Sequence, residues 1–278
     1  MVVLTDEQQQ NLSELVKHLK SETIDIVLIT HNQLESTKKC IEALYQNTII
    51  PFRLIIVDDS DKPTQDYLKS LPKDNIQYIH PDVVIKSANH AMNIGIKYVK
   101  SDIFALLGNT TFVGERWLLG SLVLMRWDSK IGVMGFKTLN PETGLVVNTG
   151  ALEETEGDSP DNWLITCETD RVSWAAVLLR KEAVEGLDEN TYIGFRGIDD
   201  TDNCWEVVRR GWKIVFNGRS FVYHKPSSSV RDTEQKKVEV KENSMRFRRK
   251  WGYNLSESPN LDQLKEHFKV NPIIVNWK

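Results

Sequence analysis

The sequence lacks several features that would point to particular classes of protein. No segment approaches the roughly 20 consecutive apolar residues of a membrane-spanning helix. The first ten residues carry Asp6 and Glu7 and no apolar core of a signal peptide. The formal net charge of −4 gives no general basic excess for nucleic acid, and the three cysteines follow no metal-binding spacing. We therefore expect a cytoplasmic protein with reduced thiols and no nucleic-acid partner, for which peripheral membrane contact stays open.

The first half of the chain alternates short apolar runs with helically spaced ones. Hydrophobic residues make up 40% of the 278 residues, enough for a sizeable core. The elements predicted here are strands at 24–30, 54–57, 76–79 and 103–107 and helices at 5–20, 34–46, 63–71 and 88–100. Apolar strands between helices indicate a parallel sheet covered on both faces, which binds ligands at the carboxyl ends of its strands.

The second half has a mixed pattern without internal repeats, low-complexity tracts or a clean linker. The elements predicted here are a helix at 116–127, a strand at 131–136, a strand-like region at 138–180, a helix at 199–210, strands at 213–216 and 220–223, and a long charged helix at about 233–250. One domain with a mixed second half is therefore expected.

Two acids end the second predicted strand. A carboxylate at Asp58 or Asp59 could accept hydrogen bonds from a base N–H or a ribose hydroxyl at the ligand-binding end of the sheet. Acids are equally common in turns and helix N-caps, so both interpretations stay open.

Three further acids, Asp199, Asp200 and Asp202, fall in the first turn of a predicted helix. The helix dipole favours acids there, and a well-capped helix would account for one of them. Three crowded carboxylates repel one another, which raises a pKa toward neutrality. The segment is therefore a candidate for a general base.

Several other side chains have two interpretations. His224 ends a predicted strand and suits either a metal ligand or a structural histidine. Trp163 and Trp174 lie in the strand-like region, where a ring stacks on an acceptor sugar or fills the core. The cluster Arg246–Lys250 is either a solvated basic face or a site that attracts a diphosphate or an anionic acceptor.

Taken together, these segments resemble the family 2 glycosyltransferases, which have the GT-A fold, from about Asp25 to Gly252. The motifs that carry the resemblance are, in chain order, Thr30-His31-Asn32, Val57-Asp58-Asp59-Ser60, Ala91-Met92-Asn93-Ile94-Gly95, Gly197-Ile198-Asp199-Asp200-Thr201-Asp202, Arg209-Arg210-Gly211-Trp212, Val222-Tyr223-His224 and Lys250-Trp251-Gly252. Their order and spacing together make the resemblance specific.

The resemblance implies an α/β fold of GT-A type, with a mostly parallel sheet flanked by helices and a mixed second half. It implies an N-terminal helical extension at 1–22, a glycosyltransferase domain at 23–226, and a C-terminal loop and helical extension at 227–278 packed on that domain. The implied activity is inverting transfer of a hexosyl-type sugar from a nucleoside diphosphate sugar, such as a UDP-sugar, to an acceptor hydroxyl. The acceptor stays open among polysaccharide, lipid-linked glycan, protein and modified nucleic acid, the last of which the acidic net charge disfavours.

The resemblance also implies roles for single residues. Asp200 would be the general base, and Asp199 or Asp202 would orient the acceptor or the base. Trp174 and Trp163 would contact the acceptor. The residues that would hold the donor are Thr30, Asn32, Asp58, Asp59, Asn93, Asn109 and Thr110.

One motif departs from the family pattern. Members usually carry Asp-x-Asp after the fourth strand to hold Mn²⁺ or Mg²⁺, whereas Gly108 and Thr110 stand at the acid positions here. Neither residue supplies an anionic oxygen to a hard cation. Three solutions for the leaving diphosphate stay open: a metal bound weakly through the diphosphate with His224 and Asp202, protein cations in place of the metal, or loss of catalysis. The candidate cations are Lys86, Lys225 and the Arg246–Lys250 cluster.

The alternative to an active transferase is a catalytically inactive sugar- or nucleotide-binding partner of another transferase. A third hypothesis, a nucleotidyltransferase, is disfavoured because no glycine-rich phosphate loop follows the first strand. The polar segment Pro226–Asp232 has the composition of a mobile loop, and we predict that it closes over bound donor.

Overall fold

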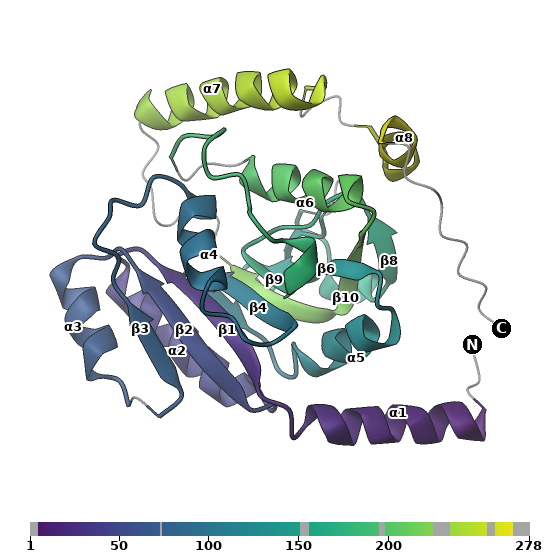
Figure 1. Ribbon diagram of the computed structural model, residues 1–278. Helices are drawn as coiled ribbons and strands as arrows, with labels where there is room; N and C mark the ends of the chain where they lie inside the picture. Colours follow the sequence, from purple (N-terminus) through teal and green to yellow (C-terminus); the bar gives the residue numbers. More distant parts are fainter. Residues whose placement is uncertain are drawn as a thin grey trace.

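The computed structural model describes residues 5–72, 74–150, 156–194, 198–224, 234–254 and 259–268. Its centre is one large sheet flanked by helices (Figure 1). The strands are β1 (Ile24–Thr30), β2 (Phe52–Asp58), β3 (Ile76–Ile79), β4 (Ile103–Gly108), β5 (Thr111–Val113), β6 (Ile131–Leu139), β7 (Val146–Asn148), β8 (Thr166–Thr169), β9 (Ala176–Arg180) and β10 (Lys213–His224). The helices are α1 (Asp6–Leu19), α2 (Leu34–Asn47), α3 (Lys62–Ser70), α4 (Ala88–Ile96), α5 (Leu119–Trp127), α6 (Asp199–Arg209), α7 (Glu234–Trp251) and α8 (Leu261–His267), with short 3₁₀ turns η1 (Pro160–Trp163) and η2 (Lys181–Ala183).

The first half forms the parallel part of the sheet, in the order β3, β2, β1, β4. This confirms the strands predicted from apolar runs. β1 and β4 are buried along almost their whole length, as expected for central strands that helices cover on both faces. Helix α4 lies very close to β1 and β2, because a Cβ at Gly95 would stand 2.5 Å from the Val27 side chain. Only glycine permits that approach.

The second half continues the sheet with both strand directions, in the order β4, β9, β6, β10, β5. β9 is antiparallel to β4 and β6, β10 is parallel to β6, and β5 is antiparallel to β10. The two strands predicted at 213–216 and 220–223 are one strand, β10, whose register against β6 shifts between Asn217 and Phe221. The polar residues at this irregularity gave the sequence the appearance of a turn. The short strand β5 was not predicted.

Two apolar layers lie on the two faces of the sheet. One joins the sheet to α1, α2 and α5, with Leu19, Leu44 and Leu122 among its buried members. The other joins it to α4, α6, α7 and α8, with Trp205 and Phe247 among its buried members. Figure 1 shows α7 lying over α6 and α4 as an outer layer, and α1 along the lower edge of the molecule. Among the described helices, none combines the length and apolar character of a membrane span.

Candidate functional site

Most of the predicted donor-binding residues come from the carboxyl ends of neighbouring strands. β1 pairs with β2 so that Thr30 lies beside Asp58, and with β4 so that Ile29 lies beside Gly108. Because β9 runs antiparallel to β4, it begins at this same end of the sheet. The fold therefore gathers residues from β1, β2, β4 and the start of β9 at the edge where parallel sheets bind ligands.

Asp58 is fully buried, and both of its carboxylate oxygens are occupied. The hydroxyls of Thr30 and Tyr78 each donate a hydrogen bond of 2.7 Å, one to each oxygen. Burial, together with the adjacent Asp58 carboxylate, raises the pKa of Tyr78, so the phenol remains a donor. Asp58 thus ties together the ends of β1, β2 and β3. Its neighbour Asp59, with a side chain 43% exposed, presents the more accessible carboxylate.

The turn after β1 has an unusual backbone. Asn32 and Gln33 have φ angles of 53° and 60°, a region that costs a non-glycine residue free energy and is enriched at functional sites. The Asn32 side-chain carbonyl accepts a 2.7 Å hydrogen bond from the Asp61 N–H, and the Asn109 amide donates to the Asn32 carbonyl at 2.8 Å. Asn109 is buried and also donates a hydrogen bond to the Thr37 hydroxyl, so its side-chain amide stabilises this turn from the protein interior.

Asp200 lies in the first turn of α6, beside the end of β4. Its carboxylate accepts a 2.9 Å hydrogen bond from the backbone N–H of Trp174. The carbonyl of the next residue, Ala175, accepts hydrogen bonds from the Gly108 N–H at 3.2 Å and the Thr111 hydroxyl at 3.0 Å. Burial raises the pKa of Asp200 to about 6, against the opposing effect of the Trp174 N–H. The cause is burial, whereas the sequence suggested crowding.

Asp199, the preceding residue, is also buried. Within the described parts of the chain no group donates a hydrogen bond to its side chain. Burial raises its pKa to about 7, with further contributions from the charges of Asp200, Asp202 and Asp188. A carboxyl group with this pKa is partly protonated at neutral pH, so it can either donate or accept a hydrogen bond.

Asp202 differs from its two neighbours and requires a correction. The sequence suggested a role in orienting the acceptor or the base, but the side chain has no exposed surface. One oxygen accepts 2.7 Å hydrogen bonds from Tyr192 and Trp251, and the other lies 2.9 Å from the Lys250 ammonium. Both carboxylate oxygens of Asp202 are thus bonded to protein groups, two of which lie on α7. We therefore assign Asp202 to anchoring α7 on α6. Lys250 also pairs with Asp188 and Glu206.

Contacts of the same kind occupy two members of the basic cluster at the end of α7. Lys250 is directed at the carboxylates of α6, and Arg246 binds Glu242 and the Thr191 carbonyl. Neither is available to a diphosphate. Three other predicted cations within the described chain are exposed, namely Arg248, Arg249 and Lys86. Lys225 lies outside the described residues, as do Gly197 and the whole Pro226–Asp232 segment.

His224 lies beside the turn after β4, because β10 pairs with β5 and sets His224 opposite Thr111. Its Nδ1 is 3.3 Å from both the Thr110 carbonyl oxygen and the Thr111 hydroxyl oxygen. Since the Thr111 hydroxyl donates its proton to Ala175, both oxygens act as acceptors toward the ring. This network assigns the ring proton to Nδ1 and leaves the lone pair on Nε2. Burial lowers the pKa of His224, which favours the neutral ring.

A neutral histidine with its second nitrogen bound to a carbonyl has the arrangement of a metal ligand. A hard divalent cation nevertheless needs several ligands. Among the residues that the structure describes, no three His, Cys, Asp or Glu side chains lie close enough to share an ion. A Cβ at Gly108 would meet no atom within 4 Å, so packing would accept an acid there, but none is present. The described residues therefore do not fit a resident metal.

Three other predicted site residues serve the fold. The Trp174 ring is buried and its indole N–H lies 3.3 Å from the Cys204 sulfur, so the ring is core and only its backbone N–H reaches the site. Trp163 donates to Asp158 at 2.9 Å from the turn η1. Asn93 on α4 bridges to the Leu187 carbonyl at 2.8 Å and to Glu189. The buried Trp174 ring is therefore not accessible to an acceptor, and the predicted roles of Trp163 and Asn93 stay predictions.

The sequence reasoning missed a buried amide pair that positions α6. Asn89 on α4 and Asn203 on α6 exchange two hydrogen bonds, of 2.9 and 2.8 Å, and are almost fully buried. Asn89 also donates to the Asp188 carbonyl. An asparagine within the apolar stripe of each helix was the available signal, because a buried amide requires a partner.

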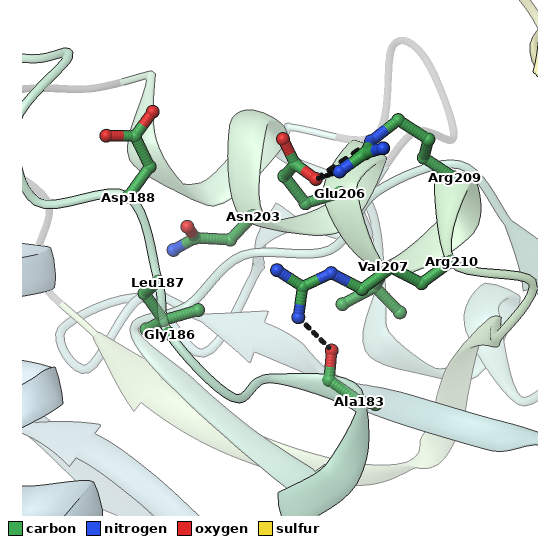
Figure 2. A pocket seen from close by; sticks show the side chains of 9 residues that line it. All are labelled: Ala183, Gly186, Leu187, Asp188, Asn203, Glu206, Val207, Arg209 and Arg210. Carbon is green, nitrogen blue, oxygen red and sulfur yellow. Dashed lines mark hydrogen bonds and ion pairs between the residues drawn. The ribbon is translucent and has the colours of Figure 1, made fainter.

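Figure 2 shows a small pocket of about 110 Å³ between η2 and α6. Its polar side chains are largely paired already: Arg209 binds Glu206 at 2.6 Å, and Arg210 donates to the Ala183 and Glu185 carbonyls. None of the predicted catalytic or donor-binding residues lines it. We therefore regard it as a surface depression next to the helix and not as the site of chemistry.

Residues 25–138 match the family model described as Glycosyl transferase family 2. Among solved structures, the chain is similar to "Crystal structure of GalNAc-T7 with UDP, GalNAc and Mn2+", with a TM-score of 0.60 and 13% identity. The similarity covers 89% of this chain and 55% of that one, so this chain spans about half the length of that protein. No curated protein sequence matches.

These findings confirm the resemblance to family 2 glycosyltransferases over residues 25–138 and an α/β fold of GT-A type. Together they support a glycosyltransferase.

Proposed function

We propose that this chain is an inverting glycosyltransferase that moves a sugar from a nucleoside diphosphate sugar to an acceptor hydroxyl, with Asp200 as the general base. The observation that carries the proposal is the position of Asp200, which the Trp174 N–H holds beside the ends of β4 and β9. Its pKa of about 6 leaves the carboxylate ionised at neutral pH and still basic enough to take a proton in the transition state.

In the proposed transfer, the acceptor hydroxyl gives its proton to Asp200 while its oxygen bonds to C1 of the donor sugar. The bond between C1 and the phosphate oxygen breaks, and its electron pair leaves with the nucleoside diphosphate. Attack opposite the leaving group inverts the configuration at C1. The Trp174 N–H binds one carboxylate oxygen of Asp200, which leaves the other for the acceptor. Asp199, adjacent and without a hydrogen-bond donor in the described chain, would bind an acceptor or sugar hydroxyl.

For the donor, we propose that Asp59, Asn32 and Thr110 make direct contacts and that a UDP-sugar is the first donor to test, because the similar structure contains UDP. Among the other residues predicted to bind the donor, Thr30, Asp58 and Asn109 hold this edge together through hydrogen bonds, whereas Asn93 bonds to Leu187 and Glu189. Among the described residues, the side chains do not build a metal site for the leaving diphosphate.

We propose a glycan, a lipid-linked glycan or a protein as acceptor, and a cytoplasmic location. We also propose residues 23–226 as the catalytic domain, with extensions at 1–22 and 227–278.

One observation favours a second candidate, a catalytically inactive sugar- or nucleotide-binding partner of another transferase. Gly108 and Thr110 occupy the positions where the resemblance expects acids, and no described cluster replaces them. That candidate predicts nucleotide binding without transfer, and a biological role that survives the substitution Asp200→Asn.

The test uses the purified chain with UDP-, GDP- and dTDP-sugars, each with Mn²⁺ and with EDTA, and measures release of the nucleoside diphosphate. The proposal is supported if at least one donor gives release of the nucleoside diphosphate and if the rate of release falls about 10²-fold or more in Asp200→Asn. A thermal-shift titration with the free diphosphates should give equal shifts for both proteins, which separates catalysis from binding. Nucleotide binding without transfer or donor hydrolysis would instead establish the binding partner.

A further inference from the structure

A larger pocket lies on the outer edge of the sheet, where β5 and β10 meet the end of α2. Its volume is about 550 Å³, within the range of about 300–1,000 Å³ that holds small ligands. The residues that line it are Asn47, Gly114, Glu115, Arg116, Phe221 and Tyr223. Because side chains alternate along a strand, Phe221 and Tyr223 lie on the face of β10 opposite to Val222 and His224. Neither Asp200 nor His224 is among the residues that line the pocket, so it is a different pocket from the site described above.

Two aromatic rings form the apolar wall of this edge pocket. The rings of Phe221 and Tyr223 are both half-buried, with centroids 5.5 Å apart and planes at 84°. Phe221 lies directly against Gly114, where a Cβ would come within 2.2 Å of the ring. Glycine at this position lets the ring pack against the backbone. Partly exposed aromatic rings of this kind provide the flat surface on which the C–H face of a sugar ring stacks.

Charged and polar groups complete the edge pocket. Glu115 and Arg116 are both exposed, and neither has a hydrogen bond or ion pair within the described chain. Arg116 also has a φ of 53°, a costly conformation for arginine that fixes where its side chain starts. A guanidinium offers paired donors and a carboxylate paired acceptors, which matches neighbouring hydroxyls of a sugar. The two opposite charges leave this part of the wall without net charge.

We propose that this edge pocket binds a pyranose unit of an uncharged glycan. An aromatic wall beside one unpaired donor group and one unpaired acceptor group is complementary to a sugar ring, which has apolar C–H faces and a polar rim. A nucleotide or another anion would meet Glu115 as well as Arg116, and a purely apolar ligand would leave both charges desolvated. Binding here does not depend on transfer activity, although in an active transferase the pocket would hold a part of the acceptor away from the reacting hydroxyl.

The experiment titrates the purified chain with cellotetraose, maltotetraose, chitotetraose and a hyaluronan tetrasaccharide, followed by calorimetry and saturation-transfer NMR. We expect at least one neutral tetrasaccharide to bind, and Tyr223→Ala and Arg116→Gly each to weaken binding at least tenfold. Arg116→Gly removes the guanidinium and relieves the positive φ, so it should fold at least as well as the wild type. The control variants Tyr98→Ala and Arg248→Ala remove exposed side chains elsewhere and should bind normally.

Absence of binding by all three neutral tetrasaccharides, preference for the anionic one, or unchanged binding by Arg116→Gly would each overturn the inference. The thermal shift with UDP should be the same in the wild type and in both edge-pocket variants. A chain that binds a neutral tetrasaccharide through Arg116 but transfers no sugar would retain this inference and lose the proposed function.

Discussion

Replacing Asp200 with asparagine should stabilise the fold while it removes activity. The pKa of about 6 lies roughly 2 units above the ordinary value of 3.8, and each unit corresponds to about 1.4 kcal/mol. The ionised carboxylate should therefore cost about 3 kcal/mol at pH 7.5. Asparagine has no charge to desolvate, and its side-chain oxygen can still accept the Trp174 N–H. The gain corresponds to a rise in Tm on the order of 5 °C.

The pH dependence gives the sign of this effect. The folded-state pKa is raised, so below about pH 3.8 Asp200 is protonated in both folded and unfolded chains and the substitution should be neutral. Between about pH 3.8 and 6 the unfolded chain ionises first, and the wild type loses stability relative to Asp200→Asn. Above pH 6 the difference should be constant. Urea unfolding of both proteins across this range measures it.

Asp202→Asn, only two residues away, is the matched control. It should lower the free energy of unfolding, whereas Asp200→Asn should raise it. It would place an amide N–H₂ or an uncharged oxygen against the Lys250 ammonium and weaken the hydrogen bonds from Tyr192 and Trp251. We expect a loss of about 2–3 kcal/mol, less than for a fully unpaired buried charge because Lys250 retains Asp188. If Asp200→Asn is less stable than the wild type at pH 7.5, or transfers sugar at a comparable rate, the assignment of Asp200 as a half-buried base without a cation partner is refuted.

Other perturbations test separate parts of the site. The rate of transfer should rise about tenfold per pH unit below pH 6 and level off above it, because Asp200 must be ionised, and a rate that is flat from pH 5 to 7 would contradict this. Combining Gly108→Asp with Thr110→Asp should create Mn²⁺ binding detectable by calorimetry, since the space beside Gly108 is open, and no gain over the wild type would show that the turn has the wrong geometry. Trp174→Phe should retain transfer within about threefold because only the backbone N–H of that residue contacts the base, so a tenfold loss would favour ring contact with the acceptor. Asn89→Ala should lower the free energy of unfolding by about 1–3 kcal/mol in urea, since its buried amide partner on α6 loses both hydrogen bonds, and an unchanged value would contradict the role of this pair.

The sequence predicted the parallel half of the fold closely because each central strand is one continuous apolar run. The strand at 103–107 and its neighbours needed no tertiary information. The second half was less accessible. β5 has only three residues, and β10 continues through the polar stretch around Asn217, where pairing with β6 is irregular. Pairing partners distant in the sequence decide both features, so local pattern could not show them.

The acidic segment could be located from the sequence, but the roles within it could not be separated. One helical turn carries three aspartates, Asp199, Asp200 and Asp202, and the sequence alone offers no way to tell their roles apart. Asp202 lies in the buried interface because Lys250 and Trp251, on a helix about 50 residues further along, surround it. Asp200 is distinguished by one backbone N–H from Trp174. The sequence likewise identified Trp174 by its ring, whereas the contact with the site comes from its backbone.

The buried pairing of Asp202 with Lys250 and Trp251 has a consequence for the order of assembly during synthesis. The sheet, the turn after β4 and α6 all precede α7 in the chain, so they leave the ribosome first. Until residue 251 has emerged, Asp202 has neither its cation nor its indole donor. The first turn of α6, which also carries Asp200, therefore gains these contacts only after α7 docks. A nascent chain that stops before Lys250 would therefore have most of the sheet but not a completed acidic site, so competence for transfer should be acquired abruptly and near the end of synthesis.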